Sequence, residues 1–263
     1  MRKYRYIYTA TLMESLQYVM NILLGFITFF VILYVFINLW EYLYSDPKAL
    51  ISGYSLPQMI WYVILTEIMW FGIRNRTLTA QMSTDIKSGT IAYGINKPYH
   101  YVFYIISKYL GEITLQFLLF FSAGVILGLL FIGGIPQFDI RQLPFALLSF
   151  FLGIMINAAI CLGIGSLSFW IEDSTPLRWI YDKMIIVIGT LFPVELFPSW
   201  LQPVIKVSPI YVINYGPAKL MVDFSYAASG KIILMQLVYM AGTAILLSII
   251  FQKGVRKLNV NGG

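Results

Sequence analysis

Side chains that could perform acid–base, metal or nucleophilic chemistry are few in this sequence. The 263 residues contain one histidine, His100, and one cysteine, Cys161. A single cysteine forms neither an internal disulfide nor a cysteine-based zinc site. The sequence also has no glycine-rich loop ending in Lys-Ser or Lys-Thr, the motif that binds nucleotide phosphates. We therefore expect the chain to bind no cofactor or metal and to carry no catalytic residue.

Three carboxylates in apolar surroundings, Glu67, Glu112 and Glu195, are candidates for a transport path. An acid inside a membrane-spanning segment is by default a candidate for a substrate or proton site. Two of these acids could instead form local ion pairs, because Lys108 precedes Glu112 by one helical turn and Arg74 follows Glu67 by two. Glu195 could contact a substrate or lie at the outer surface, and the sequence leaves both interpretations open.

The composition predicts an all-α membrane protein. Hydrophobic residues make up 59% of the chain and charged residues 11%, whereas roughly one quarter of a soluble domain is charged. A chain of this length has room for about six spans of ~20 residues in a single domain, residues 1–263, and none for a soluble catalytic domain. The net charge of +6 comes from basic residues at the ends of apolar segments. Lipid headgroups explain such residues, so we expect no nucleic acid partner.

Charge-free runs predict six transmembrane helices, at residues 22–42, 56–73, 101–131, 143–171, 177–194 and 232–252. The fifth is unusual because only residues 184–194 lack charge, about 16 Å of helix against a hydrocarbon core of ~30 Å. To cross the membrane, this span must therefore include the charged residues that precede the apolar run, from residue 177 onward. Before the first span, residues 1–21 have an amphipathic pattern that predicts an interfacial helix in the headgroup plane, although an extension of the first span fits as well.

Residues 193–217 interrupt the pattern between the fifth and sixth spans. Five of the chain's eleven prolines fall there, at Pro193, Pro198, Pro203, Pro209 and Pro217. The segment is too apolar for a free loop and too rich in proline for a straight helix. It predicts short helices that form a re-entrant hairpin in the outer leaflet.

The distribution of lysine and arginine predicts the orientation. Under the six-span assignment, thirteen of these residues lie on the side of the two termini and five on the other side. Basic residues accumulate on the cytosolic side of a membrane protein. Both termini, the loop at residues 83–104 and the loop at residues 172–183 are therefore expected in the cytosol.

The loop at residues 83–104 is longer than a connection of ~2–8 residues requires. Thr84 or Asp85 can cap a short helix, Gly89 can end that helix in a left-handed conformation, and Pro98 suits the first turn of the next helix. Apolar residues alternate with polar ones along the loop, as on a docking surface: Ile86, Ile91, Tyr93 and Ile95.

At Ile86, Gly89, Ile91, Lys97 and Pro98 the sequence resembles the cytosolic coupling-helix region of ABC-2 type exporter permeases. The shared pattern is Ile-x-x-Gly-x-Ile, then Lys-Pro, then a span. Residues 191–221 are similar to the outer hairpin of the same family. The charged Glu195 is an exception, because that hairpin is otherwise apolar. The resemblance extends over essentially the whole chain and is strongest to bacterial members of unassigned function.

This resemblance implies the permease subunit of an ATP-driven exporter in the bacterial cytoplasmic membrane. Such a permease pairs with a second copy or a different permease, and each half docks on a separate ATPase subunit that binds ATP and Mg²⁺. The cargo would be amphipathic or hydrophobic: a drug, a peptide or a lipid-linked molecule. The resemblance assigns coupling to Asp85, Ile86, Gly89, Ile91, Tyr93, Lys97 and Pro98 within residues 83–98, with Ile86 and Tyr93 as anchors.

Two other classes fit less well. A membrane-embedded lipid-modifying enzyme needs an acid–base pair, a metal cluster or an activated nucleophile, and the sequence shows none. A secondary transporter typically has inverted repeats and broken helices near the membrane midplane. Here the broken segment lies near one face and has no counterpart in the other half of the chain.

Overall fold

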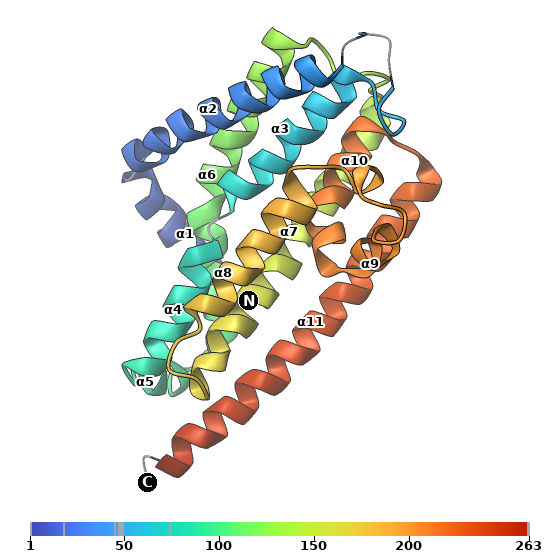
Figure 1. Cartoon of the computed structure of the whole chain (residues 1–263). Coiled ribbons are helices and arrows are strands. Elements are labelled where there is room, and N and C mark those ends of the chain that lie inside the picture. The colour runs from blue at the N-terminus through green and yellow to red at the C-terminus, as the bar shows by residue number, and fades with distance from the viewer. Residues whose placement is uncertain (1, 18, 45, 47–49, 74, 262–263) are drawn as a thin grey trace.

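The computed structural model describes residues 2–17, 19–44, 46, 50–73 and 75–261. Within these residues the chain forms helices and their connections, with no β-sheet. The longer helices are α1 (Arg2–Gln17), α2 (Val19–Leu43), α3 (Leu56–Gly72), α4 (Asn75–Lys87), α6 (Tyr101–Phe131), α7 (Leu143–Ser166), α8 (Thr175–Met184) and α11 (Tyr226–Asn261). They form an elongated bundle (Figure 1).

Short helical elements connect them. They are α5 (Ile91–Ile95), α9 (Gln202–Val207), α10 (Gly216–Val222), the 3₁₀ helices η1 (Ile140–Gln142), η2 (Leu167–Phe169) and η4 (Val194–Leu196), and the π-helices η3 (Ile185–Thr190) and η5 (Tyr211–Tyr215). The predicted break-up of residues 193–217 into short helices is thus confirmed. Their re-entry into a membrane leaflet stays a prediction.

Five segments of the described chain are long and apolar enough to cross a membrane: Ile22–Leu43, Leu56–Lys87, Tyr101–Phe131, Ile140–Phe169 and Tyr226–Leu258. Each overlaps one of the predicted spans. The predicted fifth span corresponds to α8 followed directly by η3, a continuous helical run of about 24 Å at ~1.5 Å per residue. This run is shorter than the other five, as the limited charge-free stretch indicated.

The helices bring distant loops together at two ends of the bundle. At one end, called the loop end, Lys87 pairs with Asp173 and Tyr101 stacks on Phe251 of α11. At the other, called the hairpin end, Trp40 of α2 packs against Phe192 and the hydroxyl of Tyr44 donates to the carbonyl of Tyr54. The segment from Asp173 to Phe192 therefore runs from one end to the other.

Helix α1 packs against the first half of α6. Its beginning lies at the loop end, where the ammonium of Lys3 donates to the carbonyl of Pro98 and the hydroxyl of Tyr4 accepts from the backbone N–H of His100. Farther along, the hydroxyls of Tyr8 and Thr114 are 3.2 Å apart. The amino-terminal residues thus form a helix that contacts α6, and its position in the headgroup plane stays a prediction.

Helices α3 and α7 form the centre of the bundle and hold many of its fully buried residues. Close approach of backbones requires glycine at Gly153 in α7, where an added methyl group would lie 2.8 Å from the carbonyl oxygen of Ile213. By contrast, α2, α6 and α11 expose much of their apolar surface. These outer helices are the ones available to lipid or to another protein.

Candidate functional site

The loop at residues 83–104 differs in detail from its predicted form. Helix α4 runs from Asn75 to Lys87, so Thr84 and Asp85 lie in its last turn and cap no helix start. Pro98 lies before the first turn of α6, whose N-cap is His100. These two predictions are wrong because α4 begins earlier than the polar residues suggest and a further short helix, α5, fills the loop. Gly89 has the predicted positive φ, +72°.

Asp85 connects α4 to the rest of the loop. Its carboxylate accepts hydrogen bonds from the amide of Gln81 at 3.1 and 3.2 Å and from the hydroxyl of Thr90 at 3.3 Å. The hydroxyl of Tyr101, at the start of α6, also donates to it. Asp85 is thus engaged inside the protein, where it holds α4, the Gly89 turn and α6 in one arrangement.

The apolar residues of the loop face two ways. Ile86 is 7% exposed and Ile91 fully buried, whereas Tyr93 is 77% exposed. The expectation that Ile86 anchors a docking surface is therefore wrong, because its side chain is already packed within the chain. Lys97 and Pro98 are exposed, and Lys97 lies 5.9 Å from the ring centroid of Tyr99. Tyr93 is the most exposed large side chain of α5, and Ile95 is partly buried.

The second predicted cytosolic loop lies beside the first at the loop end. In addition to the 3.4 Å ion pair between Lys87 and Asp173, the hydroxyl oxygen of Ser168 lies within hydrogen-bond distance of those of Ser83, at 2.8 Å, and Ser174, at 3.1 Å. Helix α8 starts with Ser174 at the N-cap and a proline in its first turn. The backbone N–H and hydroxyl of Thr175 hold the pKa of Asp173 below its usual value, with Lys87 contributing in the same direction.

Two of the candidate acids lie on transmembrane helices. Glu112 forms the predicted ion pair with Lys108, at 3.7 Å, and Lys108 also donates to the amide oxygen of Gln81 at 3.3 Å. Glu67 is 4% exposed on α3. Its suggested partner, Arg74, lies outside the described residues, as does Lys48, which also entered the charge count. The structure thus supports a local ion pair for Glu112. For Glu67, both a local ion pair and a substrate or proton site stay open.

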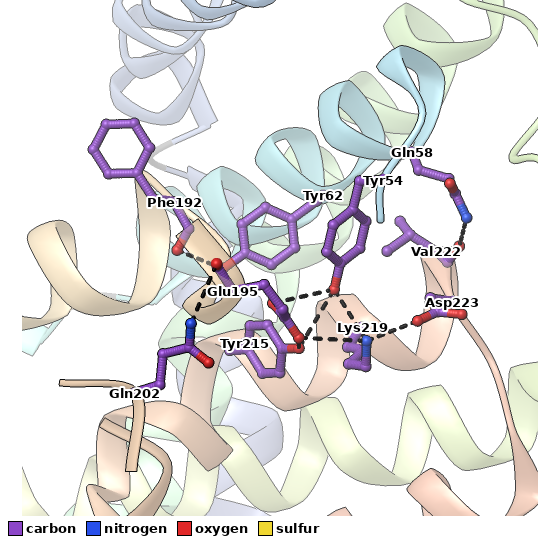
Figure 2. Close-up of polar contacts among 10 residues, drawn as sticks. All are labelled: Tyr54, Gln58, Tyr62, Phe192, Glu195, Gln202, Tyr215, Lys219, Val222 and Asp223. Atoms are coloured by element: carbon purple, nitrogen blue, oxygen red, sulfur yellow. Dashed lines mark hydrogen bonds and ion pairs between the residues drawn. The ribbon is translucent and has the colours of Figure 1, made fainter. Parts of the chain in front are cut away.

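The third acid, Glu195, belongs to a polar cluster at the hairpin end (Figure 2). Its carboxylate accepts hydrogen bonds from the hydroxyls of Tyr215 and, at 3.4 Å, Tyr54, and it lies 3.7 Å from the ammonium of Lys219. Lys219 also donates to the hydroxyl of Tyr54 at 3.0 Å and to Asp223 at 2.7 Å. The cluster joins the segment before α3 to η4, η5 and α10.

Comparison with known proteins shows the family of the chain. A family model described as ABC-2 family transporter protein matches residues 29–262. The chain belongs to this family. As an ABC-2 permease it is a transmembrane transport component and not itself a catalytic enzyme. Comparison with curated proteins returns no match.

The permease's hairpin-end cluster contains residues that sequence reasoning missed. Lys219 could have been suspected, because it is a lone cation in an apolar run and Asp223 follows it by one helical turn. Tyr54 and Tyr215 carried no such signal, since their partners are distant in sequence. Burial alone would lower the pKa of Lys219, but Tyr54, Asp223 and Glu195 outweigh it, so the pKa lies above the ordinary lysine value. The ammonium is therefore firmly charged.

Proposed function

We propose that this chain is the membrane-spanning permease subunit of an ATP-driven ABC exporter, coupled through the loop end to a separate ATPase subunit. The observation that carries the proposal is the family match over residues 29–262, combined with the absence of a phosphate-binding loop from the sequence. A transport component of this family that cannot bind nucleotide by that motif requires a partner that can.

The course of the chain supports six crossings. Five come from the long apolar segments, and the sixth from the run of α8 and η3 that leads from Asp173 at the loop end to Phe192 at the hairpin end. The beginning of α1 and the carboxyl-terminal part of α11 then lie on the same side, at the loop end. The excess of basic residues on that side supports a cytosolic location for it, in what we propose is a bacterial cytoplasmic membrane.

The loop end has the properties of a docking surface. Tyr93 projects from α5, while Asp85, Ile86 and Ile91 fix α5 and the last turn of α4 to the body of the protein. Helix α4 in turn packs against α7 and α8. A displacement of α5 by an ATPase would therefore be transmitted to the membrane-crossing helices through α4.

Pairing and cargo follow from the apolar outer surface. Helices α2, α6 and α11 expose apolar side chains that a second permease copy, or a different permease, would cover in part. We infer two permease halves and two ATPase subunits in the complete exporter. The cargo would move between the two permease halves. It would be amphipathic or hydrophobic, because the exposed surfaces of α2, α6 and α11 that could face it are apolar.

Affinity purification of the tagged chain from its own membranes, followed by mass spectrometry, tests this function. We expect an ATPase subunit with a phosphate-binding loop to co-purify, with or without a second permease. The chain alone in lipid nanodiscs should hydrolyse no ATP. ATP hydrolysis by a preparation free of other proteins, or transport without any ATPase, would contradict the assignment.

A further inference from the structure

An apolar groove of about 470 Å³ lies between α2 and α6. Its walls are one face of α2, within residues 30–41, and Leu127 and Phe131 of α6. Toward the loop end the two helices meet, since the ring centroids of Phe29 and Phe120 are 5.2 Å apart. Both helices finish at the hairpin end, so the groove lies in that half of the bundle. Its volume is that of a small-molecule site, for which ~300–1,000 Å³ is usual.

The side chains of α2 that line the groove form one continuous row. Phe30, Tyr34, Ile37 and Glu41 follow one another at intervals of three or four residues, the spacing of a single helix face. Phe30 and Tyr34 are exposed, as is Phe131 on the opposite wall. The row therefore places the carboxylate of Glu41 at the outer end of an apolar, largely aromatic track.

The polar groups of the groove favour a positively charged ligand. Among the described residues, Glu41 is the one charged side chain that lines the groove, and no ion pair joins it to another of them. The amide nitrogen of Asn38 donates to the carbonyl of Tyr34 at 2.7 Å, which leaves the amide oxygen as an acceptor. A carboxylate and an amide oxygen accept hydrogen bonds, and aromatic faces attract cations.

We propose that this groove binds an amphipathic organic cation, whose charged group lies at Glu41 and whose apolar body lies along the aromatic track. Glu41 would repel the headgroup of an anionic lipid. In phosphatidylethanolamine the phosphate stands between the amine and the acyl chains, so an amine at Glu41 would bring the phosphate into a groove that no described basic residue lines. That the bound cation is the cargo rests on the proposed function, whereas its binding to the chain does not.

Binding of radiolabelled tetraphenylphosphonium, an apolar cation, to the purified full chain in an uncharged detergent tests the proposal. We expect the unlabelled cation to displace the label and tetraphenylborate, an anion of similar shape, to leave it bound. Loss of the attracting charge in Glu41→Gln should weaken binding about tenfold, whereas Glu41→Asp should retain most of the affinity. Tyr34→Leu removes an aromatic face and should weaken binding about threefold. Glu172→Gln, at an exposed acid of the loop end, is the control and should bind normally.

Other occupants of the groove give different results. Equal binding by the wild type and Glu41→Gln would overturn the proposal, as would displacement of the label by the anion. Displacement by phosphatidylethanolamine and not by phosphatidylcholine would assign the groove to an amine lipid instead. Binding that disappears when the chain is assembled with its partners would assign the groove to a partner subunit.

The outcome separates this inference from the proposed function. A chain that co-purifies with an ATPase and binds no cation would contradict the inference alone. A chain that binds the cation and recruits no ATPase would contradict the proposed function alone.

Discussion

Tyr93 and Ile86 lie close together in sequence and have opposite environments. Because Tyr93 is exposed and Ile86 buried, the two residues should fail in different ways when truncated. We expect Tyr93→Ala to weaken ATPase association about tenfold or more, because truncation of an interface anchor commonly costs ~2 kcal/mol of binding free energy. The melting temperature should not change. A pull-down of the ATPase at matched expression measures this. Tyr226→Ala, at an exposed tyrosine of α11, is the control.

Ile86→Ala should act through stability. Removal of a buried isoleucine side chain leaves a cavity and costs about 2–5 kcal/mol in the free energy of unfolding. We therefore expect a clearly lower melting temperature in detergent, together with any loss of ATPase binding. An unchanged melting temperature would mean that Ile86 is not packed as the structure describes.

Lys219 should stabilise the hairpin end. Lys219→Met removes the cation that Tyr54, Glu195 and Asp223 share, and the loss of hydrogen bonds to a charged partner costs roughly 1–3 kcal/mol. The variant should melt at a lower temperature than the wild type, whereas Lys231→Met, at an exposed lysine of α11, should not. Equal melting temperatures for wild type and Lys219→Met would show that the cluster contributes nothing.

The raised pKa of Lys219 fixes the pH range of this effect. A raised pKa in the folded state means that the stabilisation is fully present below the ordinary lysine value of about 10.4 and is lost as the pH rises through the folded value. The difference in melting temperature between wild type and Lys219→Met should therefore stay constant between about pH 6 and pH 9. A difference that disappears within this range would contradict the charge assignment.

At the scale of elements, the turn between α4 and α5 depends on Gly89. Its φ of +72° is strained for other residues, although a side chain there would meet no neighbouring atom. Gly89→Val should cost about 1–2 kcal/mol or re-aim α5, so that ATPase association falls while membrane insertion is normal. Gly230→Ala, at an uncrowded glycine of α11, is the matched control. Normal ATPase retention by Gly89→Val would make the loop a mere connector.

The sequence predicted elements better than their contacts. Apolar runs located α3, α6 and α7 closely because length and composition alone decide whether a helix can cross a membrane. The start of α4 was missed, since its polar residues resemble those of a loop, whereas in the fold the helix packs against α7 and α8. Burial of Ile86 and the partners of Glu195 depend on segments far away in the chain. Local patterns carry no information about such contacts.

For the whole molecule, six crossings predict that both ends of the chain are cytosolic. Single cysteines at Ser88 and Lys253 should react with membrane-impermeant reagents only from the cytosol, and one at Ser199 only from outside. The native Cys161 is buried and should contribute no background. If only the five long apolar segments crossed, Lys253 would lie outside, so its labelling decides between five crossings and six.

The central claim is that a separate ATPase docks on α5 at the loop end. Its most direct test is a photo-reactive amino acid in place of Tyr93, with irradiation of intact membranes and mass spectrometry of the cross-linked product. We expect an adduct with a subunit that contains a phosphate-binding loop, and no such adduct when the same group replaces Tyr226. Absence of the adduct at Tyr93 in a complex that retains its ATPase, or equal adducts at both positions, would contradict it.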